Sequence, residues 1–162
     1  MVRSTLVWCA FVAFVGCGST DGEDATSDAD RRAVQSALLS FDRRAEPVLS
    51  RVDALVRDDR HGAAAEVLDQ ATLRALQSAI GEVEAVEVAG ADGRALRSRA
   101  MSLLVERLDA ADAYRGVLSR GRVEDLAFVD ASRRYREAEG AYEAFLESLE
   151  MPTEDEEGEG EL

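Results

Sequence analysis

Two long rows of apolar residues at helical spacing constrain the fold of this chain more than any other feature of its sequence. The first row repeats at intervals of three and four and comprises Val34, Leu38, Phe41, Ala45, Val48, Val52 and Leu55. The second repeats in the same way and comprises Phe128, Ala131, Tyr135, Ala138, Tyr142, Phe145 and Leu149. Side chains at this spacing share one face of an α-helix, so each segment is predicted to be an amphipathic helix with one buried face.

Two further helices are predicted between these rows. The second helical segment begins at Ala63 and frays near Val88. Its inward-facing residues are Leu68, Thr72, Leu76, Ile80 and Val83. The third spans about 94–119, with Leu96, Ala100, Leu103, Leu104, Leu108, Ala111, Tyr114 and Leu118 on its apolar side. Residues 82–88 also alternate as a strand would, but one strand without a partner cannot satisfy its backbone, so a helix is favoured.

The expected architecture is all-α: an antiparallel four-helix bundle (up-down-up-down) over residues 30–151. Asp30 is expected to be the N-cap of the first helix. Pro47 lies inside that helix and predicts a kink, because proline lacks the N–H and clashes with the preceding turn. The alternative is an extended coiled-coil hairpin or a dimer of the first and last helices, which carry the most regular apolar rows.

The start of the chain has the three parts of an export signal. Residues 1–16 contain Arg3, then an apolar run from Leu6 to Val15, then Gly16. The run has about ten residues, whereas a membrane-spanning helix needs about twenty, so it is interpreted as a cleaved signal peptide. The stretch Phe14-Val15-Gly16-Cys17 resembles the lipobox of bacterial lipoproteins. The alternative is an ordinary signal peptide that happens to have a cysteine beside its cleavage site.

The resemblance implies that Cys17 becomes the lipidated first residue of the mature protein. Bacterial lipoproteins generally carry several acyl chains, which anchor a protein stably, whereas one chain holds it only marginally. Gly18 stands where aspartate often marks retention at the inner membrane, which favours an outer-membrane location facing the periplasm. Cys9 leaves with the signal, so the mature domain is expected to fold without disulfides.

Acidic segments flank the predicted bundle. Residues 17–29 are expected to form a disordered tether, and residues 152–162 a disordered acidic tail. The acids near the tether are Asp21, Glu23, Asp24, Asp28 and Asp30, and those of the tail are Glu154, Asp155, Glu156, Glu157, Glu159 and Glu161. The chain has a formal net charge of −14. Such a chain should repel nucleic acid and anionic lipid, so no nucleic-acid partner is expected.

The sequence offers no recognisable catalytic arrangement. His61 is the only histidine and is interpreted as a solvated turn residue, because no second histidine or free cysteine is available beside it. The acidic stretch 24–35 has Ala29 and Gln35 where an EF-hand needs Gly and Glu. No enzyme, metal site or cofactor is therefore predicted.

Two side-chain groups leave the function class open. Tyr114, Tyr135 and Tyr142 are interpreted as residues at the edge of the core with hydrated hydroxyls, or alternatively as the lining of a ligand pocket. Arg133, Arg134 and Arg136 form a basic cluster that fits a charged outer face, an acidic partner or the chain's own tail. The expected function is a membrane-anchored envelope lipoprotein whose helical bundle is a structural or protein-interaction module with an unidentified envelope protein as partner. The alternative is a small-ligand-binding bundle in the periplasm, with a pocket near Pro47, Gly81 and the tyrosines.

Overall fold

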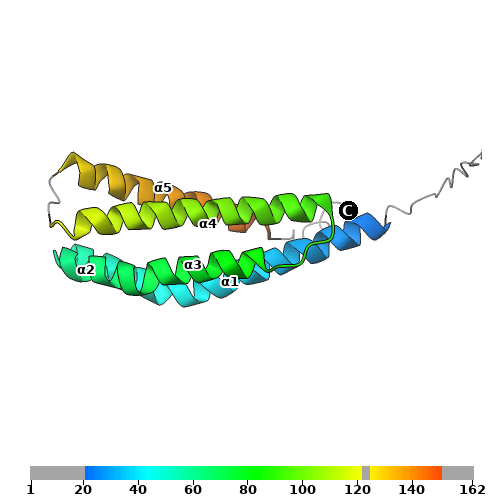
Figure 1. The fold of residues 1–162 in the computed structure, drawn as a ribbon, viewed down its shortest axis with the longest axis horizontal. Coiled ribbons are helices and arrows are strands. Elements are labelled where there is room, and N and C mark those ends of the chain that lie inside the picture. The colour runs from blue at the N-terminus through cyan, green and yellow to red at the C-terminus, as the bar shows by residue number, and fades with distance from the viewer. Residues whose placement is uncertain (1–20, 122–124, 151–162) are drawn as a thin grey trace, which may run out of the picture.

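The computed structural model of the chain describes residues 21–121 and 125–150, with side chains from residue 28 onward within these ranges. All regular structure in these ranges is helical, which confirms the all-α prediction (Figure 1). The elements are α1 (Asp21–Arg57), α2 (His61–Val67), the π-helix η1 (Leu68–Thr72), α3 (Leu73–Glu84), α4 (Ala91–Leu118) and α5 (Leu126–Ser148). Because α2, η1 and α3 follow one another without a gap, the described part of the chain forms four continuous helical stretches.

The helix α1 begins earlier than expected. It starts at Asp21, so Asp30 lies inside the helix and is not its N-cap. Acidic side chains at a helix N-terminus interact favourably with the helix dipole, so an acidic composition does not prevent a helix from starting there. The predicted tether thus overlaps the first turns of α1. Residues 17–20, the signal segment 1–16 and the predicted tail 152–162 lie outside the described residues.

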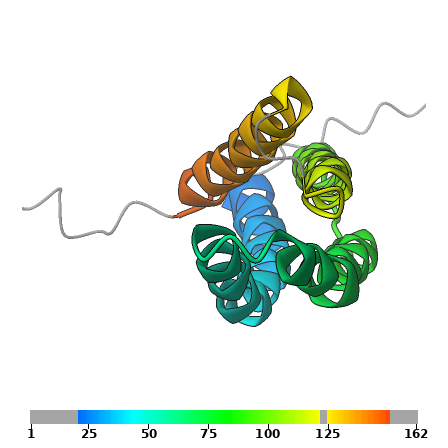
Figure 2. The same cartoon turned by 90° about the vertical axis from the view of Figure 1, so that its left-hand side faces the viewer.

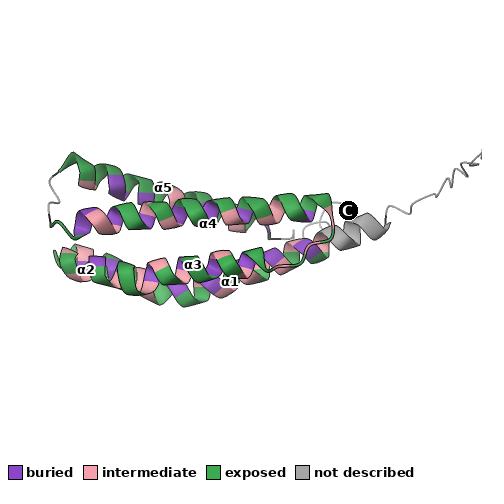
Figure 3. Cartoon of the chain, in the orientation of Figure 1, coloured by how far each residue is buried: buried purple, intermediate pink, exposed green. Residues whose placement is uncertain are grey.

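The apolar rows form the core. From the first row, Val34, Leu38, Phe41, Ala45, Val52 and Leu55 are buried, and Val48 is half-buried. From the second row, Ala131, Tyr135, Tyr142 and Leu149 are buried, whereas Phe128, Ala138 and Phe145 are half-buried. The buried residues lie along the inner sides of the helices (Figure 3). The inner face of α5 is therefore covered less completely than that of α1.

Pro47 does not interrupt α1. The helix continues through it to Arg57, and the Pro47 side chain is exposed. A helix with proline in its interior loses one backbone hydrogen bond, but apolar side chains on both sides of Pro47 pack into the same core. A single helix was preferred over two separate helices, and the structure agrees with that preference.

The second helical stretch contains a widened turn. Residues Leu68–Thr72 form a π-helix, in which one extra residue is accommodated within an otherwise α-helical segment. Thr72 is buried, and its Oγ1 has no hydrogen-bond partner among the described residues. The stretch ends at Glu84, before the predicted Val88, and residues 85–90 connect it to α4.

Side-chain contacts mark the two ends of the molecule. At one end, the carboxylate of Asp30 in α1 accepts hydrogen bonds from the backbone N–H groups of Ala89 (3.1 Å) and Gly90 (3.2 Å), just before α4 begins. At the other end, the ring of His61 at the start of α2 meets Phe128 near the start of α5 edge to face, with ring centroids 6.2 Å apart. Between these ends the helices lie side by side along the long axis (Figures 1 and 2).

Candidate functional site

Arg107 in α4 lies at the centre of the most concentrated polar arrangement in the described core. Its side chain keeps only 5% of its surface exposed. Nε and Nη2 both donate to Oε1 of Glu139 in α5, at 3.0 and 2.7 Å. Nη1 lies 3.8 Å from Oδ1 of Asp42 in α1 and has no hydrogen-bond partner in the described structure. One guanidinium thus connects three helices.

Aromatic rings cover the same guanidinium. Its Cζ lies 4.5 Å from the ring centroid of Tyr142 and 5.2 Å from that of Phe41, within the range of cation–π attraction. The two rings meet edge to face with centroids 6.1 Å apart. A buried charge is tolerated when it is paired and hydrogen-bonded, and here the rings also exclude water around it. The cluster of Asp42, Arg107, Glu139, Phe41 and Tyr142, hereafter the Arg107 cluster, therefore fixes how α1, α4 and α5 pack.

Burial shifts the pKa of one carboxyl group and two phenols near Arg107. Burial raises the pKa of the Asp42 carboxyl above its ordinary value, and the nearby Arg107 opposes that rise. Burial also raises the pKa of the Tyr142 hydroxyl, and the negative charge of Asp42 raises it further. Burial, together with the charge of Glu139, raises the pKa of Tyr135 in the same way. These shifts favour the protonated, uncharged form of both phenols in the folded protein.

The three tyrosines are core residues, as preferred, but the hydroxyl of Tyr142 is not hydrated. Tyr142 is 1% exposed, and its hydroxyl donates to the carbonyl oxygen of Leu38 at 3.3 Å. Tyr114 and Tyr135 stack on each other with ring centroids 5.2 Å apart. Tyr114 also contacts Phe128, with ring centroids 5.9 Å apart, and Tyr114 and Tyr135 are each 7% exposed. The rings are therefore part of the packing between helices, and they are not free to stack on a bound ligand.

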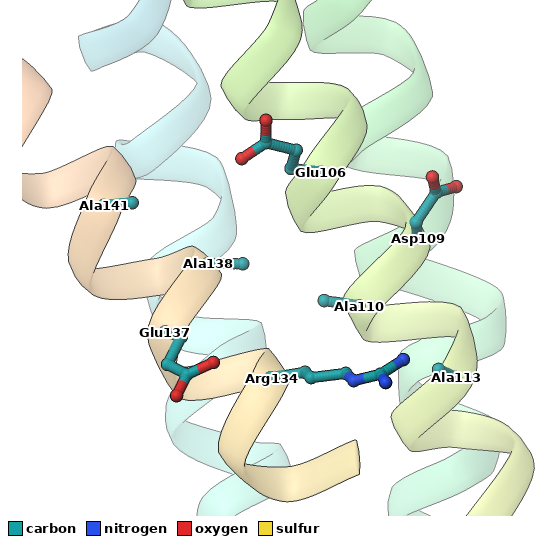
Figure 4. A pocket seen from close by; sticks show the side chains of 8 residues that line it. All are labelled: Glu106, Asp109, Ala110, Ala113, Arg134, Glu137, Ala138 and Ala141. Carbon is teal, nitrogen blue, oxygen red and sulfur yellow. The ribbon is translucent and has the colours of Figure 1, made fainter. Parts of the chain in front are cut away.

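The three arginines of the predicted basic cluster do not act together. Arg133 is engaged by Glu137 at 2.9 Å and by Asp130 at 3.4 Å, and Arg136 donates to the hydroxyl of Ser132 at 3.0 Å. Arg134 lies on another side of α5, in a groove between α4 and α5 (Figure 4). They were predicted to form one cluster because they are neighbours in the chain. Successive residues of a helix, however, point in different directions.

The groove between α4 and α5 has a floor of small residues. Ala110, Ala113, Ala138 and Ala141 line it, and Glu106, Asp109, Arg134 and Glu137 stand at its rims. Its volume is about 390 Å³. Figure 4 shows the Arg134 side chain reaching across the floor toward α4. The groove is open to solvent.

A second, more apolar surface lies at the start of α5. Leu126 is 83% exposed and Val129 is 55% exposed, and the two residues lie one turn apart. Phe128, Val129 and Ser132 line a depression of about 550 Å³, together with Arg133, Arg136 and Glu137. We call Leu126, Phe128 and Val129, with this depression, the α5 apolar patch. Large apolar side chains exposed side by side often mark contact surfaces.

His61 is not the freely solvated turn residue that was expected. It is the first residue of α2, it is half-buried, and its ring contacts Phe128. In the described part of the chain, no group of three or more His, Cys, Asp or Glu residues is placed to hold a metal ion. Cys17 and the acidic tail lie outside the described residues, so the lipidation site stays a prediction.

Sequence reasoning missed Arg107, Asp42, Glu139 and the α5 apolar patch. A signal for Arg107 was present, because it lies four residues from both Leu103 and Ala111 and so shares their inward face. A charged residue at such a position predicts a buried pair. Its partners are 65 and 32 positions away and could not be identified without the fold.

None of the described helices is both long and apolar enough to cross a membrane. No protein-family model, curated protein or solved structure matches this chain.

Proposed function

We propose that the chain is a lipid-anchored lipoprotein of a bacterial envelope whose helical domain binds another envelope protein. In this proposal the signal segment 1–16 is removed and Cys17 carries the lipid. The mature domain stands on a membrane, with the outer membrane favoured, and faces the periplasm. The lipobox-like stretch Phe14-Val15-Gly16-Cys17 supports the anchor.

The domain is proposed to be an antiparallel up-down-up-down bundle. Contacts at both ends support this topology: Asp30 meets the link before α4, and His61 meets the start of α5. Short connections between long helices favour antiparallel neighbours. The Arg107 cluster adds a contact from α1 and α4 to the second half of α5.

The observation that carries the interaction function is the α5 apolar patch. Leu126 and Val129 would each lose contact with water if a partner covered them, and apolar burial is the main favourable term in association. Their neighbours Arg133 and Arg136 provide a polar rim, the usual surrounding of an apolar contact. The net charge of −14 disfavours nucleic acid as the partner.

The anchor is tested by the lipid itself. Mass spectrometry of the mature protein should show Cys17 as an acylated N-terminal residue, and Cys17→Ser should remove the protein from the membrane fraction or leave it as precursor. A mature N-terminus elsewhere, without lipid, would show that the anchor is wrong.

The interaction surface is tested by photo-crosslinking in intact envelopes. A photoreactive residue at Val129 should give one discrete crosslinked product, and the same residue at Glu46, which is exposed on α1, should give none. A photoreactive residue at Ala127 should give the same product. Adding the substitutions Leu126→Ser and Val129→Ser to that variant should abolish the product and leave the helical circular dichroism unchanged. Equal crosslinking from Val129 and Glu46 would rule out this patch as the contact surface.

A further inference from the structure

The two acids of the Arg107 cluster are bound to the guanidinium unequally. Glu139 accepts both of the cluster's hydrogen bonds from Arg107, from Nε at 3.0 Å and from Nη2 at 2.7 Å. Oδ1 of Asp42 lies 3.8 Å from Nη1, which is beyond hydrogen-bonding distance. Glu139 therefore neutralises Arg107, and an ionised Asp42 is a second negative charge beside a cation that is already paired.

The hydroxyl of Tyr142 faces two acceptors but has one proton to donate. It donates to the carbonyl oxygen of Leu38 at 3.3 Å. The Asp42 carboxylate also lies close enough to this hydroxyl for a hydrogen bond to influence the titration of both groups. A carboxylate accepts hydrogen bonds and has no proton of its own. An ionised Asp42 therefore competes with Leu38 for the single phenol proton.

A proton on Asp42 removes this competition. A protonated carboxyl group has an O–H donor, and a phenol oxygen can accept a hydrogen bond while its own proton is donated elsewhere. Asp42 can then donate to Oη of Tyr142 while Tyr142 donates to Leu38. The result is a continuous chain of hydrogen bonds from α1 to α5 and back to α1, in which each bond strengthens the next.

The surroundings of Asp42 favour the protonated form. The charged groups around it are Arg107 on α4, Glu139 and Glu143 on α5, and Glu46 one turn further along α1. Burial is the largest influence and raises the pKa of Asp42; Glu139 and Glu143 raise it further, and Arg107 opposes the rise. The side chain keeps 32% of its surface exposed, so its proton can come directly from water.

We propose that Asp42 is a pH-sensitive contact between α1 and α5, in which uptake of one proton from water links Asp42 to Tyr142 and strengthens the packing of α5 on α1. The folded state then holds this proton more tightly than the unfolded chain does. The stability that Asp42 contributes is fully present below the ordinary aspartate pKa of 3.8 and is lost as the pH rises through the raised pKa. The groups involved all lie in the helical domain, so the contact does not depend on the lipid anchor.

The test compares Asp42→Asn with the unaltered chain by urea unfolding, followed by circular dichroism, at about pH 7.5 and about pH 5. The asparagine amide donates a hydrogen bond as a protonated carboxyl group does, at any pH. At the higher pH the unfolding equilibrium constant of Asp42→Asn should be several-fold smaller than that of the unaltered chain. At the lower pH this ratio should move toward one, because the natural carboxyl group is then protonated as well.

Asp69→Asn is the matched control. Asp69 lies 3.5 Å from Nη1 of Arg115, whose Nη2 is held by Asp112 at 2.7 Å, so its ion pair resembles that of Asp42. The Asp69 side chain, however, is 56% exposed, and exposed pairs contribute little to stability. The unfolding constant of Asp69→Asn should stay close to that of the unaltered chain at both pH values.

A second background separates the hydrogen-bond chain from simple removal of a buried charge. Tyr142→Phe keeps the ring and deletes the hydroxyl, so the gain from Asp42→Asn at the higher pH should be clearly smaller in that background. An equal or larger gain there would overturn the proposal. A ratio between Asp42→Asn and the unaltered chain that does not change with pH would overturn it too.

Discussion

The carboxylate of Asp30 occupies the space that any side chain on Gly93 would need. A Cβ at Gly93 would lie 2.6 Å from Cγ of Asp30 and closer still to Oδ2. Asp30 can approach so closely because Gly93 in the first turn of α4 lacks a side chain. The carboxylate then reaches the N–H groups of Ala89 and Gly90, beside the positive end of the α4 dipole.

Gly93→Ala should therefore destabilise the domain by roughly 1–3 kcal/mol, the usual effect of forcing extra volume into a packed site. Urea unfolding followed by circular dichroism measures the change. Gly81→Ala is the matched control, because nothing lies within 4 Å of a Cβ built there. In the interior of α3 it should stabilise the protein by about 0.5–1 kcal/mol. Similar effects of the two substitutions would contradict this account of Gly93.

Arg107→Met should destabilise the domain by roughly 3 kcal/mol, since it leaves Glu139 and Asp42 without their buried partner. The control is Arg133→Met, which removes an exposed pair with Glu137 and should change the unfolding free energy by less than about 1 kcal/mol. Thermal and urea denaturation of the two variants should differ clearly. Two equally small effects would show that the Arg107 cluster does not hold the helices together.

Alkaline pH should unfold the protein through its tyrosines. Folding raises the pKa of Tyr114, Tyr135 and Tyr142 above the ordinary value of 10.0, with burial as the main cause. The stability that these phenols contribute is therefore fully present below pH 10 and is lost as the pH rises above it. Tyrosinate absorbance should appear together with the loss of helical circular dichroism. Titration of the tyrosines near their ordinary pKa in a protein that is still helical would be the contrary result.

Phe41→Ala and Phe145→Ala should differ, although the apolar rows alone predict similar effects. Phe41 is 1% exposed and packs against Tyr142 and Arg107, so its truncation should cost roughly 3–5 kcal/mol. Phe145 is only half-buried, and its truncation should cost clearly less. Chemical denaturation of both variants tests the order, and a greater loss in Phe145→Ala would reverse it.

Periodicity predicted the helices and most of the core because apolar burial is repeated locally along each helix. Val34, Leu38 and Phe41 are buried as their spacing indicates. The pairing of Arg107 with Glu139 depends on which faces of α4 and α5 meet, and no local pattern contains that information. The same holds for Asp30, whose role as a helix N-cap was inferred from residue type and whose actual partners lie 59 and 60 positions away.

The candidate contact surface was missed for a related reason. Phe128 was correctly assigned to the inner row, but Leu126 and Val129 were given no role, since scattered apolar residues on a helix carry no distinctive spacing. Their exposure follows from the position of α5 relative to the other helices. The three arginines were grouped by chain proximity, whereas the fold separates Arg134 from Arg133 and Arg136.

The π-helix at Leu68–Thr72 is a position where the second helical stretch can lose one residue without turning the rest of its buried face away from the core. Each residue of an α-helix rotates the chain by about 100°, so a deletion inside α4 would turn every later side chain away from its neighbours. The π-helix already holds one residue more than an α-helical path requires. Removing Gln70, which is exposed, would let this turn close to α-helical geometry while Leu68 and Leu76 still face the core. Deletion of Gln70 should therefore cost less stability than deletion of an exposed residue inside α4.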